Sequence, residues 1–94
     1  MSVKIILEIP RGDSLYPILS MIEEERDNAE NIRDERVRRP IDTVLTAFIT
    51  VLRGYANHAV YARQGIRFTA SGYNWSFDPY LENTITALRY KCDV

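Results

Sequence analysis

The sequence contains a single cysteine and a single histidine, too few for the common sites built from several thiols or imidazoles. Cys92 has no second thiol with which to form a disulfide within the chain. A structural zinc site needs several Cys or His ligands at matched spacing, and Cys92 and His58 supply only one of each. We therefore expect no disulfide, no metal site and no cofactor.

Catalytic and nucleotide-binding motifs are missing as well. None of the patterns GxxxxGKS/T, GxGxxG or GxSxG occurs in the sequence. His58 lies at the edge of an apolar helical face, where a boundary residue is a more common interpretation than a general base. A chain of 94 residues also rarely builds a deep pocket by itself. We therefore predict that the protein is not an enzyme and has no catalytic residues.

Long apolar runs and an excess of one charge are both lacking. No stretch of about 20 apolar residues is present to span a bilayer. The apolar run within MSVKIILEIP is too short for a signal peptide. The formal net charge of −1 gives no general attraction to nucleic acid or to a membrane surface. Together with the lone thiol, these features predict a cytoplasmic protein with no membrane partner.

The feature around which the chain is organised is a long helical pattern over residues 40–63, PIDTVLTAFITVLRGYANHAVYAR. Its apolar residues recur at steps of three and four, and Gly65 is expected to end the helix as a C′ glycine. The apolar arc covers roughly half of the circumference, against the roughly 100° of an ordinary surface helix. We predict that this helix forms the core of the subunit and also an oligomer interface, at Ala47, Ile49 and Val51.

The segment before this helix predicts a strand and a capped helix. Residues 3–9, VKIILEI, alternate with period two and contain several β-branched residues, which is typical of a strand. Asp13 or Ser14 then supplies the side-chain oxygen that caps the first turn of a helix. A short connection to the central helix predicts that the two helices lie antiparallel.

Residues 23–39, EEERDNAENIRDERVRR, form a segment of high and mixed charge. Acids precede bases at helical spacing, which favours a helix. We predict a charged helical arm that ends in a corner before Pro40, because proline disfavours the α conformation in the residue before it. The residues of this arm expected to bind a protein partner are Glu30, Asp34, Glu35, Arg36, Arg38 and Arg39.

Residues 66–77 are predicted to form a β-hairpin. If Ser71 and Gly72 form a two-residue turn, Phe68 faces Trp75, and the large apolar side chains of both strands fall on one face. A register that sorts all residues in this way is stronger support than either strand alone.

The end of the chain predicts a third helix. Asp78 and Pro79 have the order of an N-cap followed by the first helical residue, so we expect a helix over residues 79–91. The complete expectation is a single α+β domain over residues 1–94, with the element order β-α-α-β-β-α. It comprises a three-stranded sheet, a long antiparallel helix pair and a C-terminal helix.

These features predict a non-enzymatic binding protein that acts as an oligomeric inhibitor or adaptor through protein–protein contacts. Exposed sheet edges and the wide apolar arc predict that the chain associates with itself, as a homodimer or higher oligomer, in addition to another protein. Small regulatory proteins of this kind include virus-encoded accessory proteins.

Two alternatives stay open. One is a sponge or sensor that binds an anionic small molecule or nucleotide at a subunit interface, with Arg63 and Arg67 on the anion and Tyr61 or Tyr73 stacked on its body. The other is a nucleic-acid-binding module. The negative net charge and the acids beside the arginine cluster argue against the second alternative, because nucleic-acid modules are clearly basic.

Overall fold

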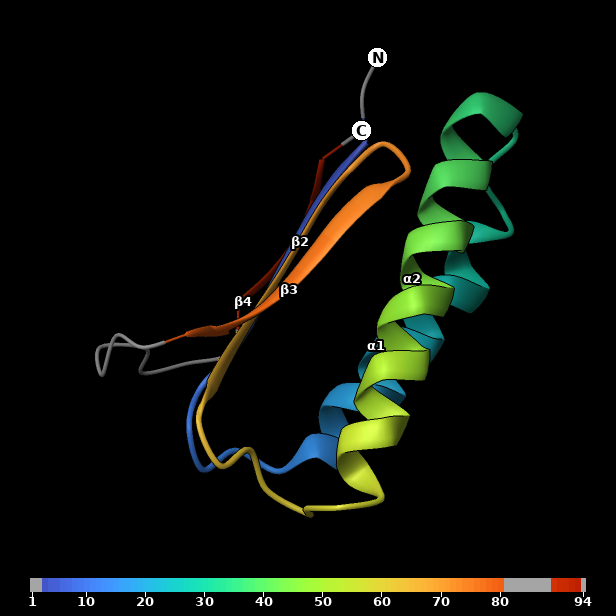
Figure 1. The fold of residues 1–94 in the computed structure, drawn as a ribbon. Coiled ribbons are helices and arrows are strands. Elements are labelled where there is room, and N and C mark those ends of the chain that lie inside the picture. The colour runs from blue at the N-terminus through green and yellow to red at the C-terminus, as the bar shows by residue number, and fades with distance from the viewer. Residues whose placement is uncertain (1–2, 81–88, 94) are drawn as a thin grey trace.

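The chain folds into a four-stranded antiparallel sheet with two helices on one face (Figure 1). The computed structural model describes residues 3–80 and 89–93. The elements are, in chain order, β1 (Lys4–Ile9), α1 (Leu15–Ala29), α2 (Glu35–Ala56), β2 (Gly65–Ser71), β3 (Asn74–Tyr80) and β4 (Arg89–Asp93). The strand order is β3-β2-β1-β4, so β1 and β2 are central and β3 and β4 are edges.

The predicted three-stranded sheet and C-terminal helix are wrong. The order is β-α-α-β-β-β, and the ends of the expected helix over 79–91 belong to two strands. Pro79 lies in β3 opposite Ile66. A proline is tolerated there because β3 is an edge strand, whose outward N–H groups make no ladder bonds. The middle of the expected helix, residues 81–88, lies outside the described residues.

Strand β4 covers the edge of β1, which the predicted three-stranded sheet left exposed. It pairs with β1, with Tyr90 opposite Leu7 and Cys92 opposite Ile5. Tyr90 and Cys92 therefore share the helix-covered face of the sheet with Leu7 and Ile5 and pack against the core. The alternation of charged and apolar residues in RYKCD was the signal for a strand, and it is shorter than the helical pattern that competed with it.

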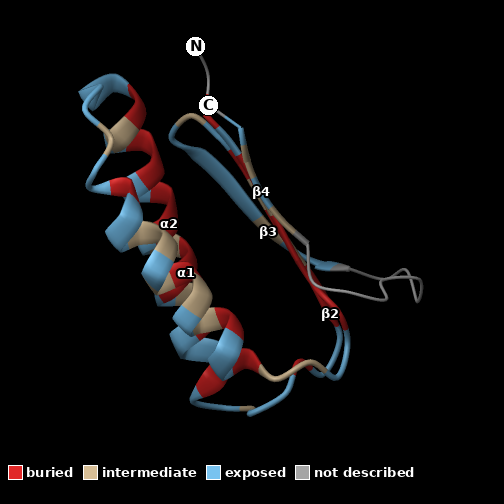
Figure 2. Cartoon of the chain, turned by 180° about the vertical axis from the view of Figure 1, so that it is seen from behind, coloured by how far each residue is buried: buried red, intermediate tan, exposed pale blue. Residues whose placement is uncertain are grey.

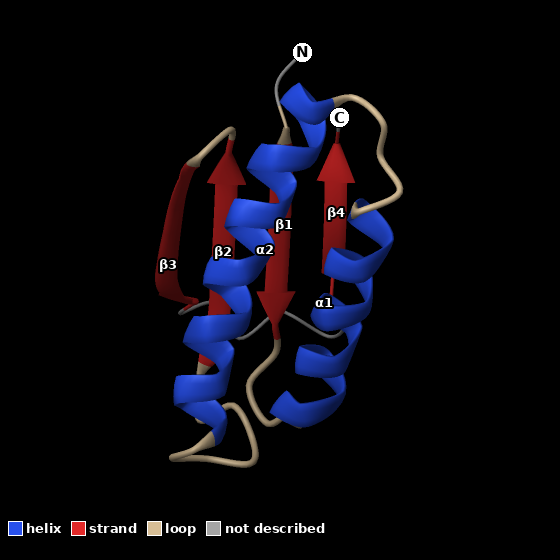
Figure 3. Ribbon diagram, turned by 90° about the vertical axis from the view of Figure 1, so that its right-hand side faces the viewer, coloured by secondary structure: helices blue, strands red, loops and turns tan. Residues whose placement is uncertain are grey.

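The predicted strand over residues 3–9 is confirmed, with Val3, Ile5, Leu7 and Ile9 all buried. These side chains meet the buried faces of α1 and α2, whose inner sides are red in Figure 2. The two helices run antiparallel, as expected (Figure 3). The core therefore lies between one face of the sheet and the helix pair.

The charged segment 23–39 is not one helical arm. Helix α1 ends at Ala29 and α2 begins at Glu35, so the corner between the helices lies at residues 30–34 rather than before Pro40. The Asp34 side chain caps α2 by accepting from the Arg36 N–H at 3.0 Å. Pro40 lies inside the second turn of α2 and is buried there, so its packing offsets the hydrogen bond that its ring removes.

The central helix is also shorter at its C-terminal end than predicted. It ends at Ala56, and Gly65 opens β2 instead of acting as a C′ glycine. The loop 57–64 is tied to the loop before α1 by backbone hydrogen bonds. The Gly12 N–H donates to the Ala62 carbonyl at 2.8 Å, and the Ala62 N–H donates to the Asp13 carbonyl at 2.9 Å. These bonds take up backbone groups that a longer helix would have used.

The hairpin is confirmed, with a register shifted by two residues. Gly72 and Tyr73 form the turn, so Phe68 lies opposite Phe77 and Ala70 opposite Trp75. Gly72 has a φ of 59° at the first central position, where a type II′ turn requires glycine. Because side chains alternate with period two, a shift of two leaves every residue that remains in a strand on its predicted face.

Candidate functional site

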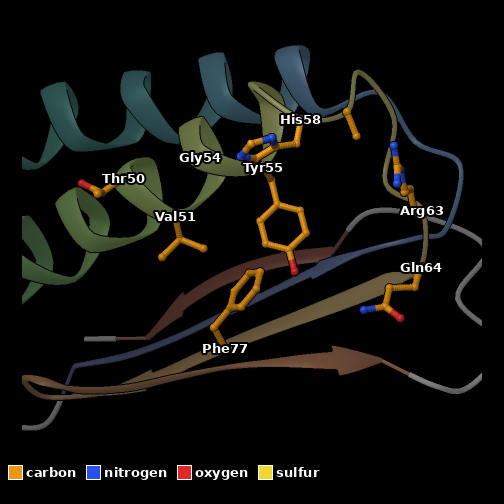
Figure 4. A pocket seen from close by; sticks show the side chains of 9 residues that line it. Thr50, Val51, Gly54, Tyr55, His58, Arg63, Gln64 and Phe77 are labelled. Atoms are coloured by element: carbon orange, nitrogen blue, oxygen red, sulfur yellow. The ribbon is translucent and has the colours of Figure 1, made fainter.

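A groove runs along one side of the molecule between α2 and β3 (Figure 4). Its volume is about 790 Å³, within the range of about 300–1,000 Å³ that small-molecule sites occupy. Its walls include Val51, Gly54 and Tyr55 from α2 and Phe77 from β3, and its far end includes Arg63. We call this feature the α2–β3 groove.

The groove exists because two helices cover only part of a four-stranded sheet. In Figure 3, α2 lies over β1 and β2, and β3 lies outside the helix pair. The side chains of β3 that face the helix layer are therefore only partly covered: Trp75 is 45% exposed and Phe77 is partly buried. An apolar strip thus remains open to solvent beside α2.

Aromatic packing holds the walls of the groove in place. The rings of Tyr55 and Phe77 approach each other from the helix and the sheet, with centroids 5.3 Å apart. The Phe77 ring also meets the buried Phe68 ring edge-on, with centroids 6.1 Å apart. Such aromatic pairs contribute beyond their buried area, so the apolar surface is formed before any ligand binds.

Polar groups gather at one end of the groove. In Figure 4, Arg63 and Gln64 lie on one side of the Tyr55–Phe77 pair, and Thr50 and Val51 lie on the other. Within the described part of the chain, the charged or titratable groups lining the groove are Arg63, His58 and Tyr55, with no aspartate or glutamate. The groove therefore combines apolar walls with a cationic end.

The sequence-predicted ligand residues are not brought together. Arg63 lines the groove, but Arg67 lies on the opposite face of the sheet, with its Nε 3.9 Å from Oε1 of Glu8. Tyr61 is exposed in the loop after α2, opposite Ser14. Tyr73 is exposed in the hairpin turn. The four residues therefore do not form one site.

The arginines and acids expected to bind a partner pair with one another around the start of α2. Glu35 forms an ion pair with Arg39 at 3.0 Å and accepts a hydrogen bond from Arg38 at 3.5 Å. Arg36 lies 3.4 Å from Asp34, and Arg38 also donates to the Ile32 carbonyl at 3.2 Å. Glu30, the remaining member, is exposed in the turn before α2. The cluster thus caps a helix, and its role toward a partner stays a prediction.

The predicted oligomer interface divides between two environments. Ile49 is only 1% exposed, so it belongs to the core of a single chain. Ala47 and Val51 are partly buried, and Val51 lines the α2–β3 groove. An interface role therefore stays a prediction for Val51 and Ala47, whereas Ile49 is covered within its own chain.

The Asp34 cap makes the stability of the protein depend on acid pH. Hydrogen bonds from the Arg36 side chain and backbone hold the pKa of Asp34 below its ordinary 3.8. Because the folded-state pKa is the lower one, this stabilisation is complete at pH values above the ordinary pKa of 3.8 and is lost as the pH falls through the folded-state pKa.

We expect Asp34→Ala to lower the melting temperature at neutral pH, with a difference from wild type that shrinks in acid. Asp42→Ala, an exposed position on the same helix, is the control; an equal effect there would contradict the cap.

The cysteine thiol lies in an environment that disfavours the thiolate. Burial, followed by the charges of Glu25 and Asp93, raises the pKa of Cys92. Burial likewise raises the pKa of Tyr90 on the same face of the sheet. A raised thiol pKa makes Cys92 a poor nucleophile at neutral pH.

The described residues contain no group of three or more His, Cys, Asp or Glu side chains placed to hold a metal ion. No helix in the same part of the chain has both the length and the apolar character needed to cross a membrane.

The sequence contained a partial signal for the groove. The apolar arc of the central helix was too wide for one partner layer, and Val51, one of the residues that widen it, lines the groove. Tyr55 and Ala59, which belong to the main apolar stripe, line it as well. Phe77 was assigned to the correct face of the hairpin, but nothing in the sequence placed that face beside α2. Gly54 and Gln64, two further lining residues, were missed because neither has a motif around it.

A scan against known protein families found no family that matches this chain. A search of curated proteins likewise found no match.

Proposed function

We propose that the protein is a non-catalytic binding protein that holds a small, largely apolar molecule in the α2–β3 groove, as a sink for that molecule or a sensor of it. The observation that supports this most strongly is the groove itself: about 790 Å³ of space beside partly exposed aromatic rings. A preformed apolar concavity with a few polar groups is the usual character of a ligand site.

The aromatic pairs add a physical reason for useful affinity. Tyr55 and Phe77 are held against each other, so these rings lose little further freedom when a ligand covers them. Covering the exposed part of Tyr55, which is 38% exposed, removes apolar surface from water. Both contributions favour an apolar ligand.

We expect the neutral dye N-phenylnaphthylamine to bind with a dissociation constant on the order of 10–100 µM, as a compact apolar ligand of its size should. The dye fluoresces more strongly in an apolar site, so protein is titrated into a fixed low concentration of dye. Near-UV circular dichroism on the same sample verifies fixed packing, because partly folded states also bind such dyes. A fluorescence signal that does not change with folded protein would contradict the proposal.

A second candidate, the protein–protein adaptor expected from the sequence, is supported by the exposure of the hairpin. Tyr73 and Trp75 are both more than a third exposed and lie at one end of the edge strand β3. Tyrosine and tryptophan dominate the energetic centres of protein interfaces, and an edge strand offers backbone groups for pairing. A second copy of the chain is the simplest partner for this surface.

A further inference from the structure

The α2–β3 groove has chemically different ends, and this difference points to a class of ligand. We infer that its ligand is a monoanion with an apolar body: the body lies against Val51, Tyr55 and Phe77, and the anionic group is bound by Arg63. This inference rests on the proposed function and assigns the chemistry of the molecule that the groove takes.

The charge of the groove lining favours an anionic ligand. Among the described residues that line the groove, Arg63 is a permanent cation, His58 and Gln64 add N–H donors, and no carboxylate is present. A cationic ligand would find aromatic faces but also the fixed charge of Arg63. A neutral ligand would gain no charge interaction with the guanidinium. An anion is the charge that complements this end.

The backbone around Arg63 is fixed, which favours the binding of an anion by its side chain. The residue before it, Ala62, is buried and is held by two backbone hydrogen bonds, to Gly12 and to Asp13. Two residues after it, Gly65 begins β2 and pairs with β3. The backbone at Arg63 is thus held on both sides, so less freedom is lost when its side chain binds an anion.

The number of guanidinium groups limits the ligand to one anionic group. Arg67, the other arginine near this loop in sequence, lies on the opposite face of the sheet beside Glu8. A nucleoside triphosphate would bring several negative charges to a site with a single arginine. A carboxylate or a sulfonate matches one planar guanidinium fork.

The test compares two dyes that share the anilinonaphthalene body and differ in one anionic group: anilinonaphthalene sulfonate and the neutral N-phenylnaphthylamine. We expect wild type to bind the sulfonate about tenfold more tightly than the neutral dye, because a hydrogen bond to a charged group is stronger than a neutral one. Arg63→Gln should remove this preference, so that the two dyes bind with similar affinity. Arg36→Gln, at the other end of α2, changes the net charge equally and should keep the preference.

Each remaining outcome overturns the inference in a distinguishable way. Equal affinities of wild type for the two dyes would show that the ligand needs no anionic group, but the groove would stand as a binding site. Persistence of the sulfonate preference in Arg63→Gln, or its equal loss in Arg36→Gln, would assign the preference to general charge. Failure of the folded protein to bind either dye would overturn the proposed function together with this inference.

Discussion

Ile49→Asp is expected to unfold the protein, whereas Val51→Asp is expected to leave it folded. Ile49 is 1% exposed in the core between α2 and the sheet, and Val51 borders the open groove two residues later. A carboxylate at position 49 loses the packing of the isoleucine and has no water or cation to stabilise it, at a cost of about 4 kcal/mol or more. A small domain has about 5–15 kcal/mol of stability in total, so this loss is severe.

The measurement is urea unfolding followed by far-UV circular dichroism for both variants beside wild type. Val51→Asp is the matched control, because it introduces the same charge on the same helix. Light scattering on Val51→Asp also tests the oligomer interface that the sequence predicted at this position: a mass that falls from two chains to one would support association through this part of α2. A folded Ile49→Asp variant with an altered mass would contradict the structure and restore the interface predicted from the sequence.

Gly54→Trp is expected to abolish dye binding without loss of stability. Gly54 lies within α2 and lines the groove, and a Cβ built on it meets no atom within 4 Å. A large side chain at this position therefore enters the groove rather than the core. Removing a helical glycine also lowers the entropy lost on folding, which offsets the exposure of the new ring. Fluorescence titration with N-phenylnaphthylamine should show no saturable binding.

The control for this experiment is Gly54→Ala. It should raise the free energy of unfolding by about 0.5–1 kcal/mol, because alanine favours the helix interior over glycine. Its methyl group adds little volume, so the variant should retain the dye affinity of wild type. Retained binding in a folded Gly54→Trp variant would show that the dye occupies another surface.

Apolar alternation predicted the parts of the fold in which a buried face contrasts with a polar one. Strand β1 was found because Val3, Ile5, Leu7 and Ile9 all face the helices. The faces of the hairpin were also correct, even though its turn was placed one residue too early, because the register shift was even. Local patterns thus specify which side of an element is buried, but they do not specify the element against which that side packs.

The errors came from two prolines and from long-range pairing. Pro40 suggested a helix start and Pro79 another, yet the first lies inside α2 and the second in an edge strand. Proline restricts only a local conformation. An edge strand tolerates the missing N–H, and in α2 the burial of Pro40 offsets the hydrogen bond that its ring removes. The pairing of β4 with β1 joins segments far apart in the sequence, and no local preference specifies that contact.

The groove follows from these same long-range contacts. The width of the apolar arc on the central helix indicated a surface that its own chain did not fully cover. Which residues line the opposite wall depends on the position of β3 at the sheet edge, and hence on the full strand order. The strand order brings Phe77 into contact with Tyr55 and places Arg63 at the end of the groove.

The most direct test of a binding site between α2 and β3 is an NMR titration of the isotope-labelled protein with anilinonaphthalene sulfonate. We predict that two-dimensional proton–nitrogen spectra show saturable shifts at Val51, Gly54, Tyr55, Arg63 and Phe77, which line the groove. Residues at the start of α2, such as Arg36 and Arg39, should not shift. Saturable shifts confined to the start of α2 or to the open face of the sheet, with none in the groove, would contradict the account.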